Sequence, residues 1–344
     1  MNFKILLCAA ALFVSCTSNR RIGDQDHSFN RDVKNIVWFQ IAGLNEEHLS
    51  MLKFSSPNST SESILEKFVC FGKVWNYNLY DLRPTSFNGF NSQILGSKNI
   101  KGQCQDYKTP AIWETTKFRN SLVGVLEVIA DNKTQSMENA LACSNQSNNW
   151  KNLALWKTGK VNGSGINSFH YQEPKRDLTP GVFFDKTCTK KGCFSSLLEN
   201  IRFLYKNYKD KEQGNNLFIV RDFTYEDALI NKNIVKSKEI LKEFESAMKF
   251  IIQENAQNKN FLFVVSSSSA KGLELPSQGK KWVGYVKQGK NILYRRPQLL
   301  SPVFAYGAGA ENFCGIYDEA SVFNRILIDP NARQLKLNSV FSLF

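Results

Sequence analysis

Three carboxylates, Asp222, Glu226 and Asp227, closely follow the apolar run Leu217–Val220. Their oxygens could together hold a hard cation such as magnesium or calcium. In the alternative interpretation, Asp222 caps a helix and the other two acids lie in its first turn, where the helix dipole favours negative charge. Of these two interpretations we favour the helix cap.

Ligands for a transition metal and residues for a serine-hydrolase triad are both scarce. The chain has three histidines: His27 in a polar N-terminal segment, His48 on a predicted surface helix and His170 in a predicted loop. Zinc sites need several His, Asp or Cys ligands. The sequence also lacks a Gly-x-Ser-x-Gly elbow, since Gly163-Ser164-Gly165 has neither the spacing nor the strand-to-helix setting. Neither a dinuclear zinc site nor a Ser-His-Asp triad is therefore predicted.

The N-terminus is typical of an exported lipoprotein. A short positive segment, Met1–Lys4, precedes the apolar run Ile5–Val14, which is too short to remain as a membrane-spanning helix. The residues before Cys16 resemble a bacterial lipobox, which predicts lipidation of Cys16. We therefore expect a signal peptide over residues 1–15, a lipidated tether over residues 16–32 and a location in a bacterial cell envelope. The outer membrane is favoured, with the protein facing the periplasm or the cell surface.

The cysteine count fits an oxidising compartment. Besides Cys8 and Cys16 there are six cysteines, and an even number in an exported chain predicts disulfides, with fifteen pairings open. Cys188 and Cys193 form the one suggestive pair, because Gly192 allows a tight turn between them. A metal site is the weaker interpretation, since the spacing does not match paired zinc knuckles.

The chain is basic, with a formal net charge of +13. A basic net charge can indicate that the partner is a nucleic acid, an anionic lipid or an acidic glycan. We exclude nucleic acid, because the basic residues are spread along the chain, no binding motif is present and the protein is predicted to be exported. The sharpest basic cluster, with no acid inside it, is predicted to be either a solvated hairpin or an anion-binding rim: Lys280, Lys281, Lys287, Lys290, Arg295 and Arg296.

Predicted strands alternate with predicted helices. Four runs of apolar, β-branched and aromatic residues predict buried strands: Ile36–Ile41, Leu122–Val128, Leu217–Val220 and Phe261–Val265. Helices are predicted after Asn45, over Pro110–Arg119 and over Asn233–Asn255, whereas Ser144–Gly165 is predicted to be a loop. This order predicts an α/β fold with a mostly parallel central sheet flanked by helices. We expect this fold to form a single domain over residues 33–344, with insertions around residues 130–216.

The C-terminal segment Ser301-Pro302-Val303-Phe304-Ala305-Tyr306-Gly307 resembles the final core strand of the alkaline phosphatase superfamily. In that family a zinc-binding histidine precedes this strand, and here Arg296 stands in its place. The resemblance covers roughly residues 33–327 and implies a layered α/β/α core. The positions that correspond to the family's metal ligands and nucleophile are, in chain order, Ala42, Thr85 or Ser86, Asp222, Ser268, Ser269 and Arg296.

These replacements imply lost chemistry. The family's catalysis relies on bound metal, which activates the nucleophile and clamps the transferring group. Ala42 has no ligand atom, and serine hydroxyls are poor replacements for a carboxylate and an imidazole. We therefore expect zinc to be lost, with no cofactor in its place. Arg296 is expected either to pair with Asp222 or to bind an anion, since a guanidinium matches phosphate or sulfate.

The resulting expectation is a non-catalytic, lipid-anchored envelope protein that binds an anionic small molecule or glycan in its cleft. One alternative is a diverged phosphoric- or sulfuric-ester hydrolase that uses Thr85 or Ser86 as nucleophile. The other is a structural or interaction lipoprotein, with a protein partner bound by Ser144–Gly165 or by the Cys188–Cys193 loop.

Overall fold

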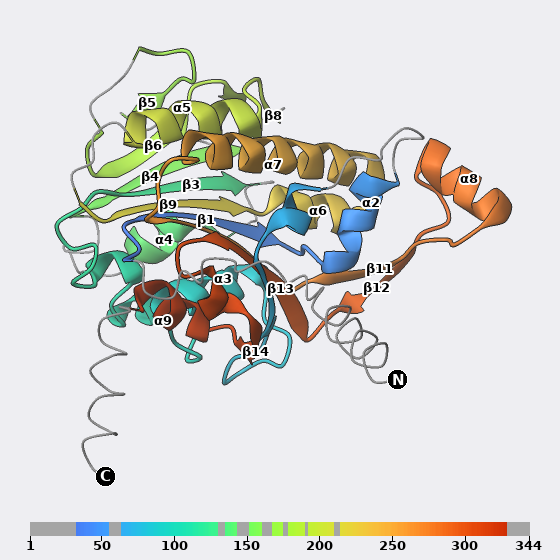
Figure 1. Cartoon of the computed structure of the whole chain (residues 1–344), viewed down its shortest axis with the longest axis horizontal. Helices are drawn as coiled ribbons and strands as arrows, with labels where there is room; N and C mark the ends of the chain where they lie inside the picture. Colours follow the sequence, from blue (N-terminus) through green and yellow to red (C-terminus); the bar gives the residue numbers. More distant parts are fainter. Residues whose placement is uncertain are drawn as a thin grey trace, which may run out of the picture.

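The computed structural model describes residues 32–54, 63–129, 135–142, 151–159, 167–174, 178–189, 192–209 and 214–328 (Figure 1). The predicted signal peptide, the lipidation site Cys16 and His27 lie outside these ranges. Within them, no helix is both long enough and apolar enough to cross a membrane.

One mixed sheet organises the described chain. Across the sheet its strands are β14 (Gly315–Asp318), β2 (Cys70–Trp75), β13 (Leu300–Gly307), β10 (Phe261–Ser268), β1 (Asn35–Ala42), β9 (Asn216–Asp222), β3 (Val123–Ile129), β4 (Leu153–Gly159), β6 (Gly181–Asp185) and β5 (Ser168–Phe169). The strands from β10 to β5 are parallel, whereas β13 is antiparallel to both of its neighbours, β10 and β2. The carboxyl ends of the parallel strands therefore meet at one edge, where α/β sheets place their binding sites.

Helices cover both faces of this sheet (Figure 1). One face packs against α3 (Ser86–Leu95), α4 (Met137–Ala142) and α9 (Ser321–Leu327). The other face packs against α2 (Leu49–Lys53), α5 (Leu197–Lys209), α6 (Thr224–Ile230) and α7 (Ile234–Glu254). Strand β1 shows why both faces are apolar: Trp38 enters the first core, and Val37 and Phe39 enter the second.

Smaller elements complete the chain. Short 3-10 helices lie at η2 (Glu46–His48), η3 (Ile64–Lys67), η4 (Cys104–Lys108), η5 (Ile112–Glu114) and η6 (Ala310–Phe313). A separate hairpin, β11 (Lys271–Glu274) and β12 (Leu293–Pro297), carries α8 (Gly279–Gln288) at its far end, and a second small hairpin joins β7 (Cys188–Thr189) to β8 (Gly192–Cys193).

The α/β fold with a mostly parallel, helix-flanked sheet is confirmed, and so are the four predicted strands and the long helix α7. The predicted helix over Pro110–Arg119 is wrong, because this segment forms η5 and turns. There the Asn152 amide donates to the carbonyls of Trp113 and Phe118, which in an α-helix would accept from their own chain. The predicted loop Ser144–Gly165 is wrong in part, since β4 lies inside it and buries Trp156.

Two disulfides join described cysteines. The predicted Cys188–Cys193 bond is present and closes the β7–β8 hairpin. The second bond joins Cys70 of β2 to Cys314, just before β14, and ties the edge of the sheet together. Sequence reasoning could not select this pair from the fifteen possible pairings.

Candidate functional site

The site lies where β1, β9 and β10 end. Ala42 is the last residue of β1 and pairs with Ser268, the last residue of β10. Beyond them the Gly43 N–H donates to the Ser268 carbonyl at 2.9 Å. Gly43 has φ +76°, and a Cβ there would lie 3.2 Å from the Glu226 side chain. A glycine is therefore needed for the chain to turn away and leave room for Glu226.

Helix α3 brings its first turn to this edge. Thr85 is the N-cap, and its hydroxyl accepts from the Asn88 N–H at 3.3 Å. Ser86 is the first helical residue and is buried. Gly89 allows the close approach, because a Cβ there would lie 1.8 Å from the Ser268 hydroxyl oxygen. Of the two predicted nucleophile positions, Thr85 caps the helix and Ser86 faces the site.

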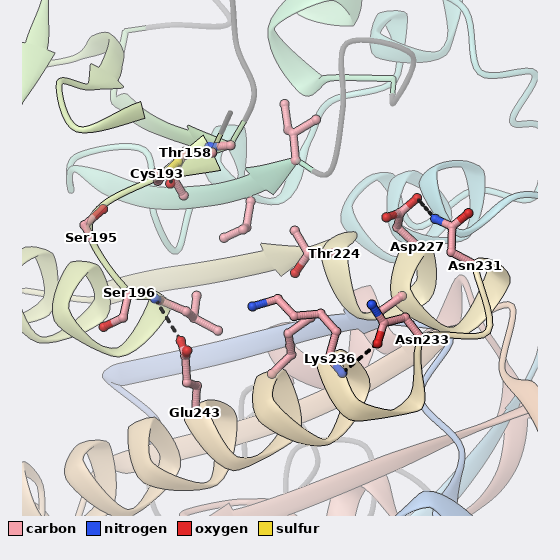
Figure 2. Close-up of a pocket in the computed structure, with 17 residues that line it drawn as sticks. Thr158, Cys193, Ser195, Ser196, Thr224, Asp227, Asn231, Asn233, Lys236 and Glu243 are labelled. Atoms are coloured by element: carbon pink, nitrogen blue, oxygen red, sulfur yellow. Dashed lines mark hydrogen bonds between the residues drawn. The ribbon is translucent and has the colours of Figure 1, made fainter. Parts of the chain in front are cut away.

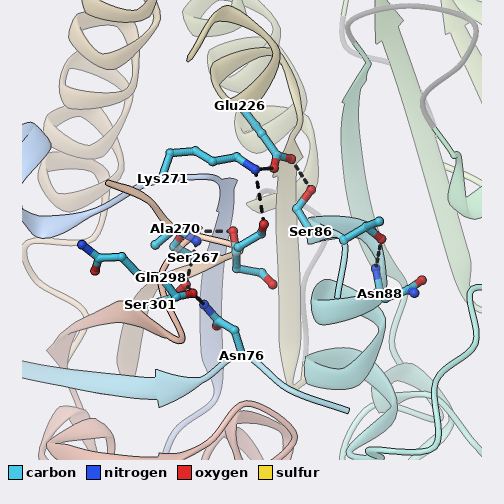
Figure 3. A network of polar contacts seen from close by, with 12 residues as sticks. Asn76, Ser86, Asn88, Glu226, Ser267, Ala270, Lys271, Gln298 and Ser301 are labelled. Atoms are coloured by element: carbon cyan, nitrogen blue, oxygen red, sulfur yellow. Dashed lines mark hydrogen bonds and ion pairs between the residues drawn. The ribbon is translucent and has the colours of Figure 1, made fainter. Parts of the chain in front are cut away.

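An ion pair fills the centre of the site (Figure 3). The Lys271 ammonium lies 2.7 Å from Glu226 Oε1, and the Ser86 hydroxyl donates to Glu226 Oε2. Lys271 also donates to the Ser269 hydroxyl at 3.4 Å. The Lys271 and Glu226 side chains are 17% and 13% exposed, so most of the pair is shielded from water. Sequence reasoning missed Lys271, and we call Lys271, Glu226 and Ser86 the central cluster.

Asp222 stabilises the start of α6. Its two oxygens accept from the Thr224 hydroxyl at 2.7 Å and from the Tyr225 N–H at 2.9 Å. Burial raises the pKa of Asp222 to about 7, although these hydrogen bonds act in the opposite direction. Asp222 therefore accepts from the first turn of α6, where Glu226 and Asp227 also lie as the favoured interpretation predicted, but the N-cap residue itself is Phe223. The alternative cation site is not formed, because Glu226 faces the central cluster and Asp227 accepts from Asn231 at 3.0 Å.

Arg296 lies on the exposed strand β12, beside Pro297, which pairs with Lys271. Asp222 is completely buried, and no ion pair joins the two residues, both of which the structure describes. The expected Arg296–Asp222 pair is therefore wrong. The cation inside the site is Lys271, which the chain supplies from β11.

His48 is buried, which corrects its predicted place on a surface helix. The Lys271 carbonyl accepts from Nε2 at 2.8 Å, so Nδ1 is the acceptor for the Tyr225 hydroxyl at 2.8 Å and the Asn45 N–H at 3.2 Å. Burial lowers the pKa of His48 to about 3, and the ring is therefore neutral at pH 7. Both ring nitrogens are occupied by these structural contacts.

A buried polar network lies behind the central cluster. Gln93 of α3 donates to Glu319 Oε1 at 2.9 Å and accepts from the Ser266 hydroxyl at 2.7 Å and from the Gln40 amide at 3.1 Å. Burial raises the pKa of Glu319 to about 7. This network could not be predicted from the sequence, because its members come from distant strands and helices.

A cavity of about 470 Å³ opens on the other side of α6 (Figure 2). It lies at the ends of β3 and β4, and Thr224, Asp227 and Lys236 line it together with the start of α5. Glu243 closes one wall by accepting from the Leu197 N–H at 3.0 Å. Consecutive residues of α6 thus face different places: Glu226 faces the central cluster and Asp227 faces this cavity.

The part of the chain that the structure describes contains one group of three residues that could share a metal ion: Asp185, Cys188 and Cys193. The two sulfurs are bonded to each other, so neither is a thiolate ligand. This group lies on β6 and the β7–β8 hairpin, away from the central cluster.

Comparisons with known proteins identify the fold. No protein-family model matches the chain, and no curated protein matches its sequence. Among solved structures, the alkaline phosphatase of the Antarctic bacterium TAB5 is 15% identical over 86% of this chain and 97% of its own, with a TM-score of 0.61. The cold-active alkaline phosphatase of the psychrophile Shewanella sp. is 12% identical over 85% and 98%, and that of Thermus thermophilus is 12% identical over 88% and 92%; both have TM-scores of 0.66. The fold is therefore alkaline phosphatase-like, as the sequence resemblance implied.

Proposed function

We propose that this alkaline phosphatase-like domain is non-catalytic, needs no metal and acts as a lipid-anchored protein of a bacterial cell envelope. The observation that carries the proposal is the central cluster. Glu226 is the carboxylate that reaches the middle of the site, and Lys271 already neutralises it at 2.7 Å. A metal ion would have to displace this ammonium from a largely buried position.

The side chains at this edge do not fit a pair of zinc ions. Ala42 has no donor atom, and Ser268 and Ser269 offer neutral hydroxyls. Both oxygens of Asp222 accept hydrogen bonds within α6, and both nitrogens of His48 are engaged. Zinc prefers imidazole, thiolate and carboxylate ligands, and the imidazole and carboxylates at this edge already have other partners.

The test is the metal content of the full chain, purified without chelator, together with its turnover of aryl phosphate, phosphodiester and aryl sulfate. We expect far less than one metal ion per chain and no turnover above that of the Ser86→Ala variant. Near-stoichiometric zinc, or another tightly held transition metal, would overturn the proposal.

One contact favours a second candidate, a metal-independent ester hydrolase. The Ser86 hydroxyl donates to the Glu226 carboxylate at the start of a ten-residue helix. This is the nucleophile–base geometry of covalent catalysis. Glu226 would take the Ser86 proton as the oxygen attacks phosphorus or sulfur and the bond to the leaving alcohol breaks, and the protonated Glu226 would pass that proton to the alcohol. A water molecule, deprotonated by Glu226, would then cleave the phosphoserine or sulfoserine ester, release the phosphate or sulfate product and restore the Ser86 hydroxyl. Turnover abolished by Ser86→Ala and by Glu226→Gln, but retained in Thr85→Ala, would establish this candidate.

The envelope location and the lipid anchor rest on the sequence. Incorporation of labelled fatty acid into the full chain, lost in Cys16→Ala, is the expected result. The anionic ligand stays part of the proposal. Its favoured binding place is the exposed basic surface around Arg296 and not the central cluster, because Glu226 already neutralises Lys271 whereas Arg296 is exposed. Equilibrium dialysis with phosphate and sulfate should show weaker binding to Arg296→Ala, and equal binding would remove the anion from the proposal.

A further inference from the structure

The hairpin of β11 and β12 carries α8 away from the body of the molecule (Figure 1). We call residues 272–297 the basic arm. Its inner side is fixed to the domain: Tyr285 is buried, and the Trp282 ring lies 5.4 Å from the Tyr285 ring and 5.9 Å from that of Phe54. The Lys238 ammonium lies 4.3 Å above the Tyr285 ring. These contacts hold α8 in one orientation, so that its other face is presented to the surroundings.

The outward face of α8 is a basic stripe with an apolar centre. Lys280, Val283 and Lys287 follow one another at spacings of three and four residues and therefore share this face. Val283 is 48% exposed, and Leu293 at the start of β12 is 49% exposed. Exposed apolar side chains between lysines are typical of segments that lie at a membrane surface.

Most of the positive charge of the arm has no ion-pair partner among the described residues. No aspartate or glutamate occurs between residues 275 and 297. Arg295 pairs with Glu274 on the facing strand. Among the described residues, no ion pair involves the remaining cations of the arm: Lys280, Lys281, Lys287, Lys290 and Arg296.

We propose that the basic arm docks onto an anionic lipid bilayer, with Val283 and Leu293 entering the headgroup region and the lysines contacting lipid phosphates. Clustered lysines are attracted to anionic lipid, and the attraction is screened by salt. The surface is separate from the central cluster, so it does not depend on whether that cluster is catalytic. The docked arm would also orient the domain on the bilayer, because the contact is made by a fixed face.

The test is flotation of the full chain with vesicles of phosphatidylcholine alone or with 30% phosphatidylglycerol. Any lipid anchor inserts into both, so the arm is measured by the preference for anionic vesicles. The arm variant replaces Lys280, Lys281, Lys287 and Lys290 with glutamine. The matched control replaces four exposed lysines elsewhere, with the same change in net charge: Lys67, Lys108, Lys151 and Lys259.

Each lysine near an anionic surface strengthens binding roughly fivefold, so the arm variant should lose up to several hundredfold of the preference at low salt. The control variant should keep most of it, and Val283→Asp should weaken binding to the same vesicles. The proposal is overturned if the arm variant and the control variant lose equally. It is also overturned if heparin in solution binds the arm as tightly as the vesicles and Val283→Asp has no effect, because the arm would then be a general polyanion site.

Discussion

Replacing Lys271 with methionine tests whether the central cluster is held together by charge. Methionine keeps the apolar stem of lysine and removes the ammonium that lies 2.7 Å from Glu226. Glu226 would then be left with the Ser86 hydroxyl as its partner, at a position where its side chain is 13% exposed. An uncompensated carboxylate in such a place disfavours the folded state.

The size of the effect follows from the burial of the pair. Breaking a fully buried ion pair costs about 3–5 kcal/mol, and breaking an exposed one costs about 0.2–1 kcal/mol. With 17% and 13% exposure this pair lies nearer the buried limit, so we expect Lys271→Met to lower the free energy of unfolding by about 2–3 kcal/mol at pH 8.

The double variant Lys271→Met with Glu226→Gln removes both charges and should recover most of the loss, giving a coupling energy of about 2 kcal/mol. Lys186→Met is the matched control, because Lys186 lies at the same distance, 2.7 Å, from Glu173, but the two side chains are 51% and 24% exposed. It should cost less than about 1 kcal/mol. Urea denaturation followed by circular dichroism measures the wild type, both single variants, the double variant and the control. The reasoning is refuted if Lys271→Met costs no more than the control, or if the effects of the two single changes simply add.

Three further predictions concern stability. Burial raises the pKa of Glu319 to about 7 from 4.5, so the folded chain binds this proton more tightly and the contribution of Glu319 to stability rises as pH falls from 7 to 4.5. Glu319→Gln should therefore change the difference in unfolding free energy between pH 8 and pH 4.5 by up to about 3 kcal/mol in urea titrations, and an unchanged difference would contradict the prediction. Gly89→Ala should lower the unfolding free energy by at least about 2 kcal/mol despite alanine's better helix propensity, because its Cβ would lie 1.8 Å from a serine hydroxyl of β10. Gly284→Ala is the control and should be nearly neutral, because its Cβ would meet only the end of a flexible side chain. Cys314→Ser breaks the Cys70–Cys314 bond, which joins residues 244 apart in sequence, and Cys193→Ser breaks the Cys188–Cys193 bond, which joins residues 5 apart. If the bonds act by restricting the unfolded chain, the first change should lower the free energy of unfolding by about 3 kcal/mol more than the second, and equal losses would rule out that mechanism.

The sheet could be predicted because its strands are continuous apolar runs that are buried on both faces. Ile36–Ile41 and Phe261–Val265 are runs of this kind, and both are central strands. Strand β4 was missed because buried Lys157 and Thr158 follow its apolar half and interrupt the pattern. Lys157 is tolerated there because its ammonium pairs with Glu138 of α4, a contact that local sequence does not reveal.

The positions of the site could be predicted better than its contacts. Parallel strands end at a common edge, so Ala42, Asp222 and Ser268 had to lie near one another once the strand order was known. Which charges face each other depends on side-chain direction and on the loops beyond the strands. Burial of His48 illustrates this, because its partners, Tyr225 and the Lys271 carbonyl, are about 177 and 223 residues away in sequence.

Lys271 is the cation beside Glu226, whereas Arg296, which stands where the resembling family has a zinc-binding histidine, is exposed on β12. The backbone after β10 explains how Lys271 reaches the site. Ser269 has φ +53°, an uncommon value for a residue other than glycine, and it turns the chain sharply after β10. The Lys271 N–H then donates to the Gly43 carbonyl at 2.9 Å, which ties the loops after β10 and β1 together and directs the lysine side chain back over the strand ends. Glu226 is held at the same edge by α6 and is mostly buried, so a positive charge beside it stabilises the folded state. In a metal-dependent site a divalent ion can supply that charge, whereas here the Lys271 ammonium lies 2.7 Å from Glu226 and supplies it from the chain itself.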